Sequence, residues 1–81
     1  MKIFVAKLNF STDSDSLQRL FEGYGEVTSA KVIMDRDTGR SKGYGFVEMT
    51  HEDDALMAIM ELNNSEFDGR EIVVKKSEPR D

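Results

Sequence analysis

The chain has 81 residues, of which 38% are hydrophobic and 33% are charged. We expect one small domain over residues 1–81, with a folded core at about 2–77. The chain contains no cysteine, which excludes disulfides, thiolate metal sites and thiol catalysis. Its apolar runs are short and Met1 leads directly into an apolar strand, so we predict a cytoplasmic protein with no membrane span or secretory signal.

The net charge of −5 argues at first against a polyanionic partner such as a nucleic acid. The acidic residues are concentrated, however, since residues 11–26 carry −3 and residues 51–66 carry −5. Together these segments carry −8, which leaves +3 for the rest of the chain. Both segments are predicted to contain helices, so the basic excess falls on strands and loops.

Residues 2–7 alternate as a strand does, with Ile3 and Val5 on one side and Phe4 on the other. Most phenylalanines lie in a core. Here Ile3 and Val5 already occupy the core side, so Phe4 is predicted to face away from it.

A helix is predicted next, with Asp13 as its N-cap because the side chain can accept from an early backbone N–H. Its apolar stripe has the spacing i, i+3, i+4, i+7 and consists of Leu17, Leu20, Phe21 and Tyr24. Gly23 and Gly25 are expected to end the helix. Phe21 and Tyr24 are therefore interpreted as core residues.

A second strand is predicted over residues 27–34, followed by a polar loop over residues 35–41. The loop contains Arg36 and Arg40, and Gly39 can supply a positive φ. It is either a solvated hairpin connection or a mobile basic arm beside a binding surface. The strand that follows favours the second interpretation.

Residues 42–49 read as a strand whose two faces differ sharply. One face is small or apolar and suits packing against helices: Gly43, Gly45, Val47 and Met49. The other face combines two aromatic rings with a cation and a carboxylate: Lys42, Tyr44, Phe46 and Glu48. Exposed rings on a rigid strand cost free energy unless something stacks on them, and unpaired bases are the usual partner.

A second helix is predicted over residues 52–62, with an apolar stripe of Ala55, Ala58, Ile59 and Leu62. Leu56, Met57 and Met60 fall outside the stripe and should be partly exposed. They are either edge packing, which we favour, or a patch for a protein partner. His51 has no second ligand or nucleophile near it in sequence and is interpreted as a surface residue.

Asn63 and Asn64 are predicted to end this helix, because asparagine tolerates left-handed geometry. A turn at residues 67–69 then leads to a last strand over residues 71–76, and residues 77–81 form a short tail.

The order of elements, strand–helix–strand repeated twice, predicts an α+β fold of the ferredoxin-like βαββαβ type. In this fold a four-stranded antiparallel sheet carries both helices on one face, and its other face is open. The alternation of the strands places aromatic and basic side chains on that open face: Phe4, Tyr44, Phe46, Lys2, Lys31, Lys42 and Lys75.

Two segments carry a resemblance to the RNA recognition motif family. Residues 42–49 match that family's octapeptide, Lys/Arg-Gly-Phe/Tyr-Gly/Ala-Phe-Val-x-Phe/Tyr, at seven of eight positions, with Met49 in place of an aromatic. Residues 3–8 resemble its hexapeptide, although Lys7 replaces the usual asparagine. The resemblance covers roughly residues 2–77. The start at Met1 and the short tail resemble, more narrowly, the small single-domain RNA-binding proteins of bacteria.

The resemblance implies that Phe4 and Phe46 stack on successive bases, that Tyr44 packs against a sugar or a neighbouring base, and that Lys42 meets a phosphate. The other expected RNA contacts are basic: Lys2, Lys31, Arg36, Arg40 and Lys75. The implied protein is a monomer without cofactor or metal. It would bind single-stranded RNA, and single-stranded DNA more weakly.

Two other classes of function compete with this one. Some family members bind peptides through the helical face, with degraded sheet motifs and an Arg-x-Phe element before the last strand. Here the aromatics are kept and the corresponding residues are Arg70-Glu71-Ile72. An acylphosphatase-like enzyme would need an anion-binding arginine in the first loop, and residues 8–11 contain none. We therefore expect no catalytic residue.

Overall fold

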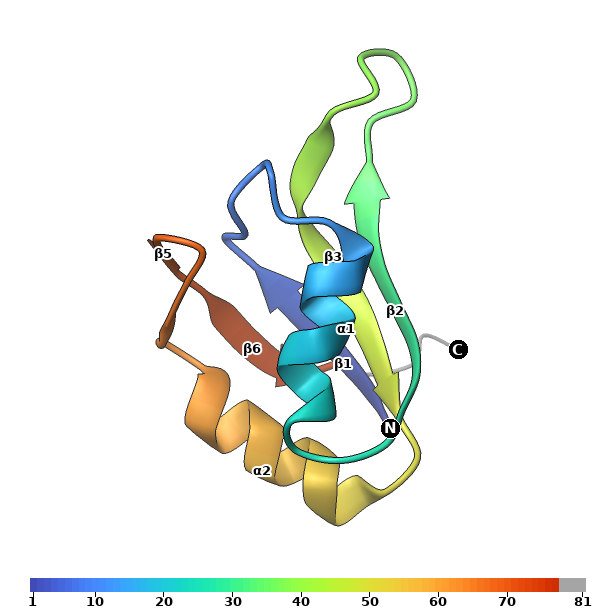
Figure 1. Ribbon diagram of the computed structural model, residues 1–81, viewed down its shortest axis with the longest axis vertical. Helices are drawn as coiled ribbons and strands as arrows, with labels where there is room; N and C mark the ends of the chain where they lie inside the picture. The colour runs from blue at the N-terminus through green and yellow to red at the C-terminus, as the bar shows by residue number, and fades with distance from the viewer. Residues whose placement is uncertain (78–81) are drawn as a thin grey trace.

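The computed structural model describes residues 1–77 and has two helices packed on one face of a four-stranded sheet (Figure 1). The elements in chain order are β1 (Lys2–Ala6), α1 (Ser14–Glu22), β2 (Val27–Met34), β3 (Ser41–Met49), α2 (Glu52–Leu62), β4 (Glu66–Phe67), β5 (Arg70–Glu71) and β6 (Val73–Lys76). The sheet is antiparallel throughout, with strand order β2-β3-β1-β6. The predicted α+β fold is confirmed. The predicted tail lies, from residue 78 onward, outside the described residues.

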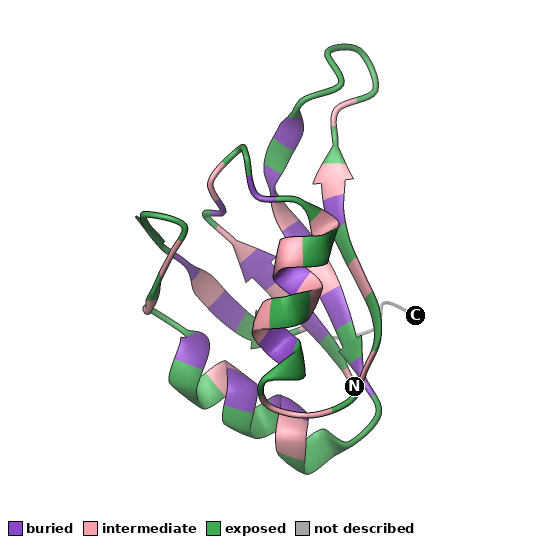
Figure 2. Ribbon diagram, in the orientation of Figure 1, coloured by how far each residue is buried: buried purple, intermediate pink, exposed green. Residues whose placement is uncertain are grey.

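The core fills the space between the sheet and the helices, and the strand alternation predicts which strand residues enter it. Ile3 and Val5 of β1 and Val47 of β3 are fully buried, whereas their neighbours along each strand face the opposite side (Figure 2). Within residues 1–77, no helix is long and apolar enough to cross a bilayer.

Helix α1 begins and packs as its sequence predicts. The Asp13 carboxylate accepts a 2.8 Å hydrogen bond from the Ser16 backbone N–H, which lowers the pKa of Asp13 and caps the helix. Phe21 has no exposed surface, and Tyr24 packs at the edge of the core. The Tyr24 hydroxyl donates to the Glu61 carboxylate at 3.4 Å, so the segment that follows α1 contacts α2.

The close approach of β2 to β3 requires a glycine at position 45. It pairs with Val32 across the β2–β3 ladder, next to a register shift in β2. A Cβ at Gly45 would overlap the carbonyl oxygen of Lys31. The absence of a side chain therefore lets β2 approach β3 closely.

The last predicted strand is divided in the structure. Glu71 pairs with Glu66 in the small β4–β5 hairpin, whose turn residues Asp68 and Gly69 both have positive φ. Ile72 exchanges backbone hydrogen bonds with the chain that leaves α2 instead of extending β6. An Asp-Gly pair between two short extended runs is a known hairpin signal, so the sequence contained this information.

Lys7 adopts a left-handed conformation immediately after β1, with φ of 60°. For residues other than glycine, asparagine and aspartate, this conformation costs on the order of 1–2 kcal/mol. Asn64, at φ of 67°, shows the same geometry with a residue that tolerates it.

We expect Lys7→Asn to raise the free energy of unfolding by about 1 kcal/mol, because asparagine relieves the left-handed strain. The reciprocal control, Asn64→Lys, should lower it by a similar amount. Urea unfolding of both variants measures the two changes. A Lys7→Asn protein that is less stable than the parent would contradict this explanation.

Candidate functional site

Three aromatic side chains lie together on the sheet face that carries no helix, and we call them the sheet-face aromatics: Phe4, Tyr44 and Phe46. The ring of Phe4 is 5.5 Å from that of Phe46 and 5.8 Å from that of Tyr44. Phe46 and Tyr44 are 6.4 Å apart and nearly perpendicular. They come from β1 and β3, the two central strands, where Phe4 pairs directly with Phe46. Each ring is half-buried by its neighbours, which fixes it in place and leaves its outer surface free.

Lysines surround these rings. The Lys2 ammonium lies 4.7 Å from the centre of the Phe46 ring, and the Lys75 ammonium lies 5.7 Å from the centre of Phe4. Lys31 is the strand partner of Phe46 on β2, and it is exposed like Lys2 and Lys75. Flat rings bordered by cations suit a ligand that combines planar groups with negative charge.

The loop between β2 and β3 is closed by hydrogen bonds within itself. The Asp35 carboxylate accepts from the backbone N–H groups of Asp37 at 2.8 Å and Thr38 at 3.2 Å. These bonds, helped by the charge of Lys42, lower the pKa of Asp35, so the carboxylate stays ionised. The predicted positive φ of Gly39 is confirmed at 72°. The loop is thus an organised turn, and its predicted mobility stays a prediction.

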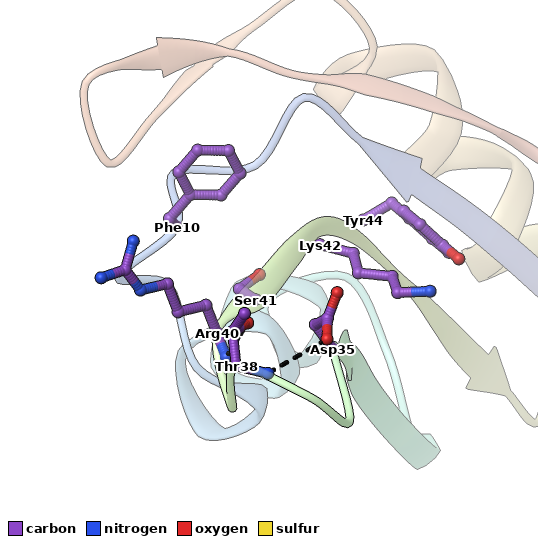
Figure 3. Close-up of a pocket in the computed structure, with 7 residues that line it drawn as sticks. All are labelled: Phe10, Asp35, Thr38, Arg40, Ser41, Lys42 and Tyr44. Atoms are coloured by element: carbon purple, nitrogen blue, oxygen red, sulfur yellow. Dashed lines mark hydrogen bonds between the residues drawn. The ribbon is translucent and has the colours of Figure 1, made fainter.

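The predicted basic residues of this region do not all lie together. Arg36 and Arg40 are both exposed on the loop, and Lys42 is exposed at the start of β3. Only Arg40 and Lys42 border the cleft that runs from the loop to Tyr44 (Figure 3). Arg36 is not among the residues that line the cleft.

Phe10 also lines this cleft, and it was not predicted from the sequence. Its side chain is 64% exposed, on the loop between β1 and α1. A signal was present, since Phe10 belongs neither to the strand alternation nor to the apolar stripe of α1.

The helical side of the molecule differs in character. Leu56, Met57 and Met60 of α2 are 45%, 50% and 77% exposed, as their positions outside the stripe predict. A protein partner at these residues stays a prediction. The first turn of α2 carries three acidic residues, Glu52, Asp53 and Asp54. Within residues 1–77, no three His, Asp or Glu side chains gather as a metal site would require.

The family model of the RNA recognition motif matches residues 3–73, a range that contains all of β3, all of β1 except Lys2, and the three sheet-face aromatics. The chain belongs to this family. The RNA recognition motif assignment agrees with the resemblance seen in the sequence.

Comparisons with known proteins agree with the assignment. The glycine-rich RNA-binding protein 4, mitochondrial, of Arabidopsis thaliana is 48% identical over 98% of this chain and 58% of its own length. A solved RNA-binding protein named PG1 is 51% identical, with a TM-score of 0.95, and the match covers 100% of this chain and 98% of that one. The RNA recognition motif of Rna15 with bound RNA (GU) is 25% identical, with a TM-score of 0.86, over 99% of this chain and 85% of that one.

The chain spans about half the length of several curated relatives that it matches. These relatives come from plants such as Arabidopsis thaliana and Zea mays, so the narrower resemblance to small bacterial proteins has no support among them. Some are named as mitochondrial or chloroplastic, and the cytoplasmic location stays a prediction.

Proposed function

We propose that this protein binds single-stranded RNA on the open face of its sheet and that it performs no catalysis. The observation that carries the proposal is the cluster of Phe4, Tyr44 and Phe46, whose rings lie 5.5–6.4 Å apart on the two central strands. In this family's domains such rings stack two or three bases.

The proposed roles follow the positions of the side chains. Phe4 and Phe46 stack on successive bases, Tyr44 packs against a sugar or a neighbouring base, and Lys42 meets a phosphate. The remaining cations around the face neutralise further phosphates: Lys2, Lys31, Lys75, Arg36 and Arg40. Single-stranded DNA offers similar bases and the same phosphates but lacks the 2′-hydroxyl, so we expect it to bind more weakly.

Amide chemical-shift mapping tests the proposal. We would titrate the protein with a pool of short single-stranded RNAs and, in parallel, with a blunt RNA duplex of equal nucleotide content. Stacking requires unpaired bases. Shifts should therefore appear on β1 and β3 with the single strands and be much weaker with the duplex. Shifts of equal size on β1 and β3 with the duplex would refute the stacking mechanism.

The same titration separates the proposal from a protein-binding function. If the RNA pool produced no shifts on the sheet, the sheet proposal would fail. The exposed side chains of α2, Leu56, Met57 and Met60, would then be the surface to test against peptides.

Salt dependence gives a further prediction. A logarithmic plot of affinity against salt has a slope of about −0.7 per phosphate neutralised on a single strand. Glu48 is the strand partner of Lys2, and Asp35 lies beside Arg40 and Lys42, so we expect two or three effective contacts and a slope of about −1.5 to −2. A titration with a short single-stranded RNA from low to moderate salt measures it.

A slope steeper than about −4 would mean that phosphate contacts dominate and the rings are secondary. The double variant Arg36→Ala with Arg40→Ala is the matching control. It should weaken binding less than Phe46→Ala, because salt barely screens stacking.

A further inference from the structure

A second pocket, of about 430 Å³, lies where the β1–α1 loop and the first turn of α1 meet the end of β2. Its lining residues come from the segments 10–15 and 32–34, so it is distinct from the cleft beside Tyr44. Val32 lines the pocket and also belongs to the core between the sheet and the helices. The pocket therefore lies on the helical side of the sheet, away from the sheet-face aromatics.

Two exposed apolar side chains line this pocket. Phe10 is 64% exposed and Met34 is 51% exposed, although both are large hydrophobic residues. Alternation along β2 would place Met34 on the same face as Val32, but a register shift in the β2–β3 pairing falls between them, and only Val32 is buried. Irregularities of this kind redirect a side chain. The pocket thus offers a ring and an adaptable methionine against which an apolar side chain of a partner can pack.

The hydroxyl groups of the pocket already form hydrogen bonds within the fold. The Ser14 hydroxyl oxygen accepts a 3.0 Å bond from the Val32 backbone N–H, which ties the start of α1 to β2. The Thr12 hydroxyl donates at 2.7 Å to the Asp68 carboxylate, and the Ser11 hydroxyl donates within its own loop. These bonds hold the walls in place. A ligand would therefore meet mainly the apolar side chains and the carboxylates.

The pocket is negatively charged. Asp13 and Asp15 line it, and among the described residues no lysine or arginine does. The hydrogen bond from the Ser16 backbone N–H lowers the pKa of Asp13, so this carboxylate stays ionised. The N-terminus of α1 contributes roughly half a positive charge, which offsets only part of the two carboxylates. Phosphates are therefore disfavoured here, whereas ammonium and guanidinium groups are favoured.

We propose that this pocket binds a short basic segment of a partner protein, with one apolar side chain packed against Phe10 and Met34 and a neighbouring arginine or lysine paired with Asp15. Such a partner docks on the helical side of the sheet and leaves the sheet-face aromatics open. The assignment does not depend on RNA binding. It is also separate from the exposed side chains of α2, because the described lining residues all precede residue 35.

Amide chemical-shift titration of the protein without RNA tests the assignment with three pools of capped hexapeptides. The first pool combines one leucine, methionine or phenylalanine with two arginines, and fills the other positions with glycine and serine. The second pool has glutamate in place of arginine, and the third has serine in place of the apolar residue. The first pool should shift the amides of residues 10–15 and 32–34, and the other two should shift them much less.

Two variants measure the two parts of the contact. Met34→Ala should weaken binding of the first pool by about 3-fold to 10-fold, because it removes an apolar contact. Asp15→Asn should weaken it by about 2-fold to 5-fold at low salt, as expected for one ion pair at a surface.

Helix α2 supplies a matched control for each variant. Met57→Ala truncates a side chain that is 50% exposed, against 51% for Met34. Asp53→Asn removes a carboxylate from the first turn of α2, as Asp15→Asn does from the first turn of α1. Each control should weaken peptide binding clearly less than its counterpart in the pocket.

RNA titration of the same variants separates the pocket from the RNA surface. Met34 is not among the residues that line the cleft beside Tyr44. Met34→Ala should therefore bind short single-stranded RNA within about twofold of the parent.

The assignment is overturned if the first pool leaves residues 10–15 and 32–34 unshifted, or if either of the other pools shifts them as strongly. It is also overturned if Met57→Ala weakens peptide binding as much as Met34→Ala, which would locate the peptides on α2. A loss of RNA binding in Met34→Ala as large as in Phe46→Ala would make the pocket part of the RNA site instead. A protein that bound the first pool here but bound no RNA would refute the proposed function and leave this assignment standing.

Discussion

Phe46→Ala should weaken binding of short single-stranded RNA by about 5-fold to 150-fold, because base–aromatic stacking is worth roughly 1–3 kcal/mol per base. The ring lies on the open face beside Phe4 and under the Lys2 ammonium, outside the core between sheet and helices. Its removal should therefore leave the fold intact. Fluorescence or shift titration gives the affinity, and thermal unfolding checks the fold.

Phe46→Tyr is the matched control, since it retains a stacking ring on the same strand and should bind nearly as the parent does. Phe4→Ala should behave like Phe46→Ala, because the two rings face the same side at paired positions. If Phe46→Ala binds RNA with the affinity of the parent, the sheet face is not the binding surface.

Phe21→Ala, unlike Phe46→Ala, should destabilise the fold. Phe21 is among the largest fully buried side chains, and truncating a buried phenylalanine costs about 3–5 kcal/mol. Small domains have a total stability of about 5–15 kcal/mol, so much of it would be lost. Thermal unfolding should show a midpoint lower by more than about 10 °C.

Phe10→Ala is the control for this experiment, because it makes the same truncation at a side chain that is 64% exposed. Its unfolding midpoint should stay close to that of the parent. A Phe21→Ala protein that melted within a few degrees of the parent would contradict the assignment of Phe21 to the core.

Much of the fold was predictable because α1, β1 and β3 have clear periodicity. The alternation of residues 42–49 separated Val47 from Phe46, and the burial in the structure follows that separation. The stripe containing Leu17 and Phe21 placed α1 against the sheet. These signals are local, so they need no knowledge of distant parts of the chain.

The small β4–β5 hairpin shows where local patterns are insufficient. Alternation correctly placed Ile72 inward, but it predicted one continuous strand through Glu71. The backbone partner of each residue depends on which segment lies beside it, and the segment that leaves α2 competes with β1 for Ile72. Pairing of this kind is decided by the packed structure.

The sequence alone determined which side chains could form the open face, since strand period and residue type decide that Phe4, Tyr44 and Phe46 share one side. Only the tertiary structure decided that Phe10 joins them at the edge. That position depends on Asp68, which is 59 residues from Asn9 along the chain and holds the loop through its carbonyl oxygen. Contacts between distant segments have no periodic signature in the sequence, because they form only when the two loops meet at one end of the sheet.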